Sequence, residues 1–171
     1  MSALAFRVIG IAQSMGSKRA FVPKGWTRPV ITDSNRNLKS WQSLVAEAAA
    51  RAISARQGHD RSAGQGTEAW RLLDGPVRLC IAFYLKRPKG LPKKYVAHTK
   101  APDVSKLVRS TEDALSGIVY RDDSQIVELV AGKYYAAVDD VPHCDIEVQT
   151  TEGARAVEWS AGSLPLCAEA G

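Results

Sequence analysis

The sequence predicts an α+β domain with a mixed sheet of about four to five strands and two main helices. Segments with alternating apolar residues occur before and after two segments whose apolar residues follow helical 3–4 spacing. The 171 residues, 45% of them hydrophobic, are enough for one buried core. No apolar run approaches the ~18 residues of a membrane span, so we expect no membrane contact. We expect one domain over residues 1–151 and a weakly patterned, partly disordered tail over residues 152–171.

The cysteines and the first residues favour a cytoplasmic protein. Cys80, Cys144 and Cys167 are scattered, with no CxxC pair, so we interpret them as small apolar fillers in a reducing compartment. Residues 1–16 lack a basic n-region, and Arg7 interrupts their apolar part. This segment therefore reads as a strand and not as a signal peptide.

The N-terminal third is expected to form a strand and an irregular hairpin. Residues 4–9 suit the first strand, and residues 18–22 and 29–33 suit two strands paired across a polar turn. Phe21 and Trp26 lie within this segment, and basic residues with exposed aromatic side chains are typical of a surface that follows a DNA strand. The alternative is that both aromatic side chains pack beneath the hairpin. The basic residues of the segment are Lys18, Arg19, Lys24 and Arg28.

A long helix is expected over residues 37–57. Its alanine content favours helix, and either Ser34 or Asn35 can cap it. The Gly- and Ser-rich residues 58–70 that follow are interpreted as a flexible loop. The apolar helical face consists of Leu38, Trp41, Val45, Ala48 and Ala52.

The second half of the chain is expected to alternate strand, helix and strands. Residues 76–85 alternate as a core strand, and residues 104–116 form a helix with Gly117 as its C′ residue. Strands are then expected over residues 124–136 and 144–150. The buried face of the helix consists of Leu107, Val108, Thr111, Ala114 and Leu115.

Charge is divided between the two halves of the chain. Residues 1–100 carry 18 basic and 5 acidic side chains, whereas residues 101–171 carry 5 basic and 13 acidic ones. Residues 86–100 contain six cations and no acid, which indicates a loop that contacts phosphate. The alternative is a solvated surface, which is the usual role of a run of like charges. A DNA coat protein has little reason to concentrate acids, whereas a nuclease binds metal with carboxylates and phosphate with cations. The candidate DNA-binding residues are Lys86, Arg87, Lys89, Lys93, Lys94, Lys100, Lys106 and Arg121.

Carboxylates stand at both ends of the second helix. Asp103 precedes it, and Asp122 and Asp123 lie in the turn before the next strand. If helix and strand pack as neighbours, these ends can converge on Mg²⁺ or Mn²⁺, which would lower the pKa of an attacking water. Arg109 can stabilise charge on the phosphate or pair with Asp113. The alternatives are that Asp103 is only a helix cap and that the other two aspartates are turn residues.

The stretch over residues 101–135 resembles the signature of RusA-type Holliday junction resolvases, particularly bacteriophage members. The family pattern is roughly Pro-Asp-Leu-Asp-(Asn/Lys)-Leu-x-(Lys/Arg), then Asp-Ala-Leu-(Asn/Thr)-Gly, then Asp-Asp-(Ser/Ala)-Gln-(Ile/Val). This chain reads PDVSKLVR, DALSG and YRDDSQIVEL in the same order. The resemblance implies a RusA-like fold and a homodimeric, Mg²⁺-dependent endonuclease of recombination and repair. Such an enzyme makes paired nicks in branched, four-way DNA junctions by hydrolysing phosphodiester bonds.

The resemblance also implies roles for individual residues. Asp103 matches the first motif aspartate, Asp123 the essential aspartate of the pair, and Asp122 its neighbour. Arg109 falls where the family has a catalytic lysine. The resemblance thus gives Asp103, Asp123 and Arg109 as catalytic, with Asp122 joining the two aspartates as a metal ligand. Ser105 replaces the second motif aspartate, which removes one negative charge from the site.

Ser105 leaves three interpretations open. Asp122 takes over as a third ligand and the enzyme is active. Alternatively, the protein binds branched DNA with weak or no cleavage. In the third interpretation Ser105 is an introduced change.

Overall fold

The computed structural model of the chain describes residues 3–16, 18–33, 35–62 and 70–151. The expected tail over residues 152–171 lies outside the described residues. Among the described helices, none is long and apolar enough to cross a membrane. The elements, in chain order, are β1 (Ala3–Ile9), β2 (Lys18–Phe21), β3 (Val30–Asp33), α1 (Leu38–Ser62), β4 (Val77–Leu85), α2 (Val104–Leu115), the 3₁₀ turn η1 (Asp123–Gln125), β5 (Ile126–Tyr135) and β6 (His143–Thr150).

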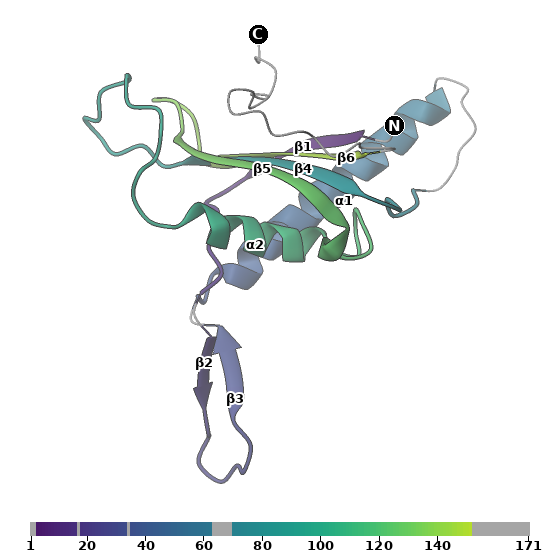
Figure 1. Cartoon of the computed structure of the whole chain (residues 1–171). Helices are drawn as coiled ribbons and strands as arrows, with labels where there is room; N and C mark the ends of the chain where they lie inside the picture. Colours follow the sequence, from purple (N-terminus) through teal and green to yellow (C-terminus); the bar gives the residue numbers. More distant parts are fainter. Residues whose placement is uncertain (1–2, 17, 34, 63–69, 152–171) are drawn as a thin grey trace, which may run out of the picture.

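The main sheet has four strands in the order β1-β6-β4-β5. β4 and β5 are parallel, whereas β6 is antiparallel to both β1 and β4. Both helices cover the same face of this sheet (Figure 1). The predicted fold class, α+β with a mixed sheet and two helices, is therefore confirmed.

The connection between β4 and β5 determines where α2 points. Because the two strands are parallel, the chain must return along the sheet between them, and α2 lies on that return path. The first turn of α2 therefore lies near the C-terminal ends of β4 and β5. Its last turn lies near the start of β5. The two predicted carboxylate positions flank this helix.

The core lies between the sheet and the two helices. Every second residue of β4 is buried from Val77 to Leu85, as the alternation predicts, and so is every second residue of β6 from Cys144 to Val148. The indole Nε1 of Trp41 donates to Thr111 Oγ1 over 3.3 Å, joining α1 to α2 inside this core. The expected buried face of α2 is confirmed at all five residues, with Ser110 added.

α1 differs from its prediction at both ends. It continues to Ser62, beyond the predicted end at residue 57, because the backbone at Gly58 stays helical and costs only ~1 kcal/mol relative to alanine. At its start, Asn35 accepts a hydrogen bond from the Asn37 N–H over 3.0 Å, whereas Ser34 lies outside the described residues. Its buried face also differs in part. Ala49 and Ile53 are buried, whereas Ala48 and Ala52 are only partly buried.

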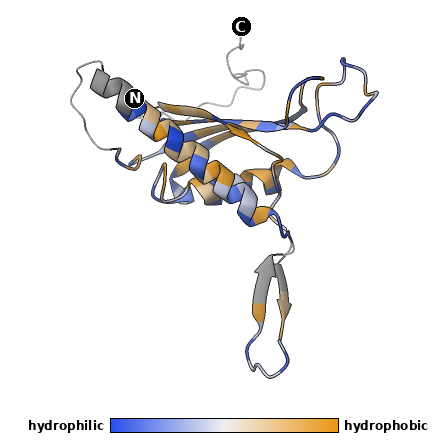
Figure 2. Ribbon diagram, turned by 180° about the vertical axis from the view of Figure 1, so that it is seen from behind, coloured by the Kyte–Doolittle hydropathy of each residue, from blue (hydrophilic) through white to orange (hydrophobic). Residues whose placement is uncertain are grey.

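The hairpin of β2 and β3 forms a separate two-stranded sheet, with Lys18 opposite Asp33 and Phe21 opposite Val30. It projects away from the body of the molecule (Figure 1). Hydrophilic residues surround its far end (Figure 2). The side chains of Phe21 and Trp26 are 52% and 63% exposed. The alternative that they pack beneath the hairpin is therefore wrong.

Candidate active site

Asp103 occupies the N-cap position of α2 but does not act as its cap. Its backbone is extended (φ −68°, ψ 139°), and its side chain makes no capping hydrogen bond. Instead, Oδ2 lies 3.2 Å from Nζ of Lys106, and both side chains are more than half exposed. The alternative that Asp103 serves only to cap the helix is not supported, because its carboxylate faces solvent and one exchangeable cation.

Asp122 is used by the turn that carries it. Its Oδ1 accepts a hydrogen bond from the Ser124 N–H over 3.0 Å, and hydrogen bonds from Ser124 lower the pKa of the Asp122 carboxyl group. The Gln125 side chain accepts from the backbone N–H groups of Asp122 and Arg121, which completes a capping box. The turn interpretation thus holds for Asp122, whereas Asp123 exposes its side chain.

Gln125 fixes this acidic turn (residues 122–125) to the rest of the domain. Its Nε2 donates to the carbonyl oxygens of Leu73 and Gly75 over 3.1 and 2.9 Å. Both acceptors precede β4, so one glutamine side chain ties the start of β5 to the start of its parallel neighbour. The acidic turn that carries Asp123 is therefore tied to the segment before β4 by side-chain hydrogen bonds. The sequence motif gave no role to Gln125.

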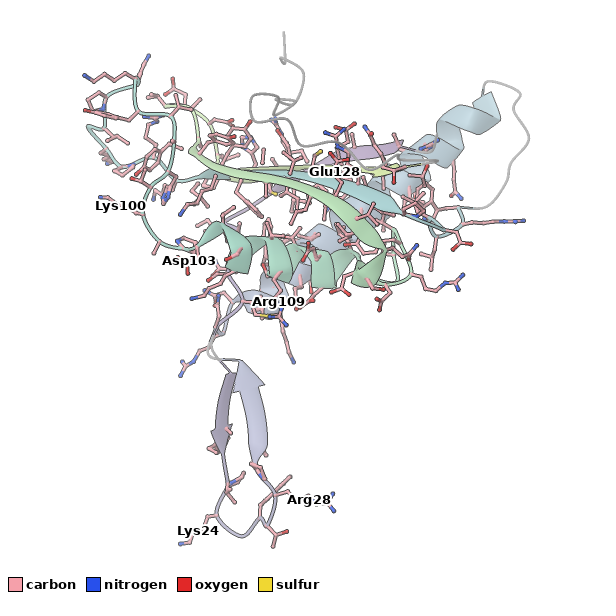
Figure 3. The ribbon with its side chains drawn as sticks, viewed as in Figure 1. Lys24, Arg28, Lys100, Asp103, Arg109 and Glu128 are labelled. Carbon is pink, nitrogen blue, oxygen red and sulfur yellow. The ribbon has the colours of Figure 1, made fainter. Side chains whose placement is uncertain are left out.

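The two carboxylate positions stand at opposite ends of α2 within one chain. The helix has 12 residues, which corresponds to about 18 Å at 1.5 Å per residue. Figure 3 places Asp103 at its first turn, and the acidic turn follows its last turn. In the part of the chain that the structure describes, no three His, Cys, Asp or Glu residues gather closely enough to hold a metal. The expected convergence of both ends is therefore not found within a single chain.

Glu112 adds a carboxylate at the C-terminal end of α2 that the sequence motif did not single out. Burial raises its pKa, and repulsion from Asp123 and Asp113 raises it further, whereas Arg109 lowers it. Asp113 and Asp123 therefore lie close enough to Glu112 to repel its carboxylate, so acidic side chains gather at this end of α2. Negative charge accumulated in this way favours the approach of a cation. The signal in the sequence was the acidic pair Glu112 and Asp113 one turn before the helix ends.

Ser105 and Arg109 share the solvent-facing side of α2, four residues apart. Both are exposed, and Figure 3 shows Arg109 on the helix beyond Asp103. Ser105 lies two residues after Asp103, so an acidic side chain at this position would add negative charge to the first turn. Arg109 lies between the two carboxylate positions and within electrostatic range of Glu112.

The basic loop (residues 86–100) presents its lysines to solvent but not its arginine. All five lysines are exposed, as are Lys106 and Arg121. Arg87 instead donates to the carbonyl oxygens of Ala136 and Pro92 over 2.9 and 3.2 Å, and its guanidinium lies 5.4 Å from the ring centre of Tyr135. Arg87 thus holds the loop in place. The exposed lysines are the groups free to meet a polyanion.

Lys133 links the basic loop to the start of α2. Its Nζ donates to the carbonyl oxygen of Pro102 over 2.6 Å and to that of Lys100. Pro102 directly precedes Asp103 and Lys100 lies three residues before it, so the C-terminal part of β5 positions the first candidate carboxylate. The sequence pattern treated Lys133 only as part of a strand, because its role depends on packing between β5 and α2.

The exposed carboxylates and the lysine loop lie on one α+β scaffold. The family profile described as "Endodeoxyribonuclease RusA" matches residues 15–149, which include every element of the candidate site. The chain belongs to this family of endodeoxyribonucleases. It is also similar to "Uncharacterized protein YqaN" of Bacillus subtilis (strain 168), with 32% identity over 75 residues. That match covers 38% of this chain and 53% of the relative, so the chain spans about half the length of this curated protein.

Proposed function

We propose that the protein is a structure-selective endonuclease that resolves four-way DNA junctions by metal-dependent hydrolysis of phosphodiester bonds. The observation that carries the proposal is the exposed carboxylate of Asp103 between the basic loop and Lys106, inside the region that matches the endonuclease family. Carboxylate oxygens are the ligands that Mg²⁺ and Mn²⁺ prefer. A bound metal would lower the pKa of the attacking water and polarise the phosphate.

The candidate ligands fit such a metal only if two chains contribute. Asp103 and Asp123 lie at opposite ends of α2, so one chain alone does not place both on the same ion. In a two-fold symmetric dimer, the start of α2 in one copy can meet the end of α2 in the other. We therefore propose a homodimer with two equivalent sites, each using Asp103 of one copy and Asp123 of the other.

β5 supplies a surface for this dimer. It is an edge strand of the main sheet, and its Val127 and Leu129 side chains are 61% and 46% exposed. Its far end is covered by the bridge from Ala97 to Tyr134. A long edge strand with exposed apolar residues is a template for pairing with another chain. Antiparallel pairing of two β5 strands would place the acidic turn of one copy beside the C-terminal end of the partner strand, where Lys133 holds the start of α2.

The remaining side chains take roles that follow from their exposure. The lysines of the basic loop bind the phosphates of the DNA arms. Arg109, between the two carboxylate positions, stabilises negative charge on the phosphate under attack. Asp122 keeps its capping role, because its carboxylate is already hydrogen-bonded to Ser124. It supports the position of Asp123 and adds negative charge beside it.

Ser105 favours a second candidate function, a junction-binding protein that cleaves weakly or not at all. A serine hydroxyl is neutral, so the first turn of α2 holds its metal with one carboxylate fewer than the family motif. This function predicts salt-dependent, junction-selective binding without nicks. The substitution Ser105→Asp separates the two functions, because it should lower the Mg²⁺ concentration required for cleavage by about tenfold or more if the added carboxylate joins the site.

The test uses the purified protein, a labelled synthetic four-way junction and Mg²⁺ or Mn²⁺. The expected result is paired nicks that Asp123→Asn abolishes. The matched control is Asp139→Asn, which removes an exposed carboxylate from the turn between β5 and β6 and should leave cleavage unchanged. Binding without any nick, in either metal, would support the junction-binding function in its place. Failure to bind the junction at low salt would exclude both functions.

A further inference from the structure

We propose that the β2–β3 hairpin is an arm that reads the branch point, with Trp26 stacking on a base exposed where DNA strands part. The arm comprises residues 18–33. This inference rests on the proposed function and adds a recognition element for its substrate. It concerns binding alone, so it can be tested separately from cleavage.

The chemistry of the arm fits an unstacked base between phosphates. Residues 18–33 contain four cations and one acid, Asp33, so the arm has a net positive charge that is complementary to a polyanion. Lys24 and Arg28 lie on either side of Trp26 in the sequence, and both are exposed at the far end of the arm (Figure 3). An indole ring carries no charge with which to bind a phosphate, but it offers a flat apolar face to any base.

A tight turn presents Trp26. Its backbone N–H donates to the Pro23 carbonyl oxygen over 3.0 Å, and Gly25 has a φ of +87°. These features match a turn in which glycine occupies the third position, where other residues are strained. Trp26 therefore follows a defined backbone bend, and 63% of its surface is exposed. A two-stranded hairpin is marginally stable by itself, so a partner for this exposed ring would also stabilise the arm.

The root of the arm is attached to the helix of the candidate site. The Met15 N–H donates to the Lys106 carbonyl oxygen over 3.0 Å, and Ser110 Oγ donates to the Gln13 carbonyl oxygen over 2.6 Å. On the other side of the root, Asn35 Nδ2 donates to the Ser14 carbonyl oxygen over 2.9 Å. The arm thus leaves the body beside the turn of α2 that carries Lys106, close to Asp103. DNA held by the basic loop at Asp103 would pass the arm.

The rival occupant of the exposed ring is a second copy of the chain. Charge favours DNA, because residues 18–33 carry four basic side chains and one acidic side chain and therefore suit a partner with abundant negative charge. DNA presents that charge along its whole length. A dimer contact by the arm predicts that loss of Trp26 lowers dimerisation.

The experiment compares the affinities of full-length Trp26→Ala and wild-type protein for a four-way junction and for a linear duplex of the same sequence. It is run without Mg²⁺, so that no DNA is cut. We expect Trp26→Ala to weaken junction binding by about tenfold and duplex binding by less than about twofold. Trp26→Phe should keep most of the junction preference. Thr27→Ala, at the exposed neighbouring residue, is the matched control and should leave both affinities unchanged.

A second measurement locates the contact. A junction with 5-iododeoxyuridine at the branch point should crosslink under ultraviolet light to the peptide that contains residue 26, and Trp26→Ala should remove the crosslink. An unchanged junction preference in Trp26→Ala, or equal losses on junction and duplex, would overturn the inference. So would a monomeric Trp26→Ala variant, which would assign the ring to a second copy. If wild-type protein binds no junction, the proposed function fails with the arm. If only the inference about the arm fails, the wild-type protein still prefers the junction to the duplex.

Discussion

The Nζ of Lys106 lies 3.2 Å from Oδ2 of Asp103, one helical turn earlier on α2. Because both side chains are more than half exposed, this ion pair adds less than about 1 kcal/mol to stability. The ion pair can therefore break at little cost in free energy when a metal binds the carboxylate and a phosphate binds the ammonium group. The pair thus keeps the two groups of opposite charge beside each other before DNA binds.

Lys106→Ala should weaken junction binding without unfolding the protein. If Lys106 neutralises one phosphate, the slope of log K against log salt concentration becomes less steep by about 0.9. A salt titration of binding to a four-way junction measures this slope. Arg51→Ala removes an exposed cation from α1 outside the proposed interface and should leave the slope unchanged. An unaltered slope in Lys106→Ala would remove this lysine from the interface.

Substitutions of Asp122 and Asp123 should have different effects, the first mainly on stability and the second on cleavage. Asp122→Ala removes the carboxylate that accepts from Ser124, so it should lower the melting temperature while retaining part of the cleavage. Asp123→Asn should leave the melting temperature almost unchanged and abolish cleavage. Thermal unfolding and junction cleavage, measured on the same samples, check both expectations. The reverse order of effects would make Asp122 the ligand and Asp123 the structural residue.

Glu112 should make stability depend on pH. Its pKa in the folded chain is raised above the ordinary value of 4.5 by burial and by repulsion from Asp123 and Asp113. The folded state therefore holds this proton more tightly than the unfolded chain, and stability falls as pH rises above about 4.5. Glu112→Gln should melt at a higher temperature than wild type at pH 7 and at the same temperature below pH 4. An equal difference at both pH values would contradict this origin.

Arg87 should contribute to the stability of the fold, whereas Lys93 should contribute to DNA binding. Arg87→Ala breaks the hydrogen bonds to Ala136 and Pro92 and should cost about 2 kcal/mol of unfolding free energy. Lys93→Ala, an exposed neighbour in the same loop, should leave stability within about 0.5 kcal/mol and weaken DNA binding. Denaturant unfolding and a binding titration give the two values. A stable Arg87→Ala with weakened binding would return Arg87 to the DNA-contacting set.

Much of the fold followed from local patterns in the sequence. The alternation in β4 and β6 and the 3–4 spacing in α2 predicted which residues are buried, because one face of each element is covered by the other layer. The positive φ of Gly117, at +76°, likewise follows from its place after a helix. The end of α1 was missed, because a glycine does not stop a helix unless the chain turns there.

The geometry of the candidate site was less predictable. The motif grouped Asp103 with Asp123 in sequence, but their separation depends on α2 running alongside its neighbouring strands, which no local pattern reveals. The structural uses of Arg87 and Gln125 depend on backbone carbonyls from distant segments. From the sequence, Arg87 was expected to contact DNA and Gln125 to lie in the strand predicted over residues 124–136. The exposure of Trp26 likewise became apparent only once the hairpin was seen to leave the body.

In the proposed homodimer, each active site takes Asp103 from one copy and Asp123 from the other. This sharing is tested by mixing two inactive variants, Asp103→Asn and Asp123→Asn, under conditions in which subunits exchange. In a mixed dimer one site contains both substitutions and the other contains neither.

Junction cleavage by this mixture is the decisive measurement. With random exchange, half of the dimers are mixed and each has one intact site, so we expect about a quarter of the wild-type activity, seen as single nicks. The two variants assayed separately should remain inactive. A mixture that contains mixed dimers by light scattering or mass spectrometry, yet cleaves no more than either variant alone, would contradict the shared site.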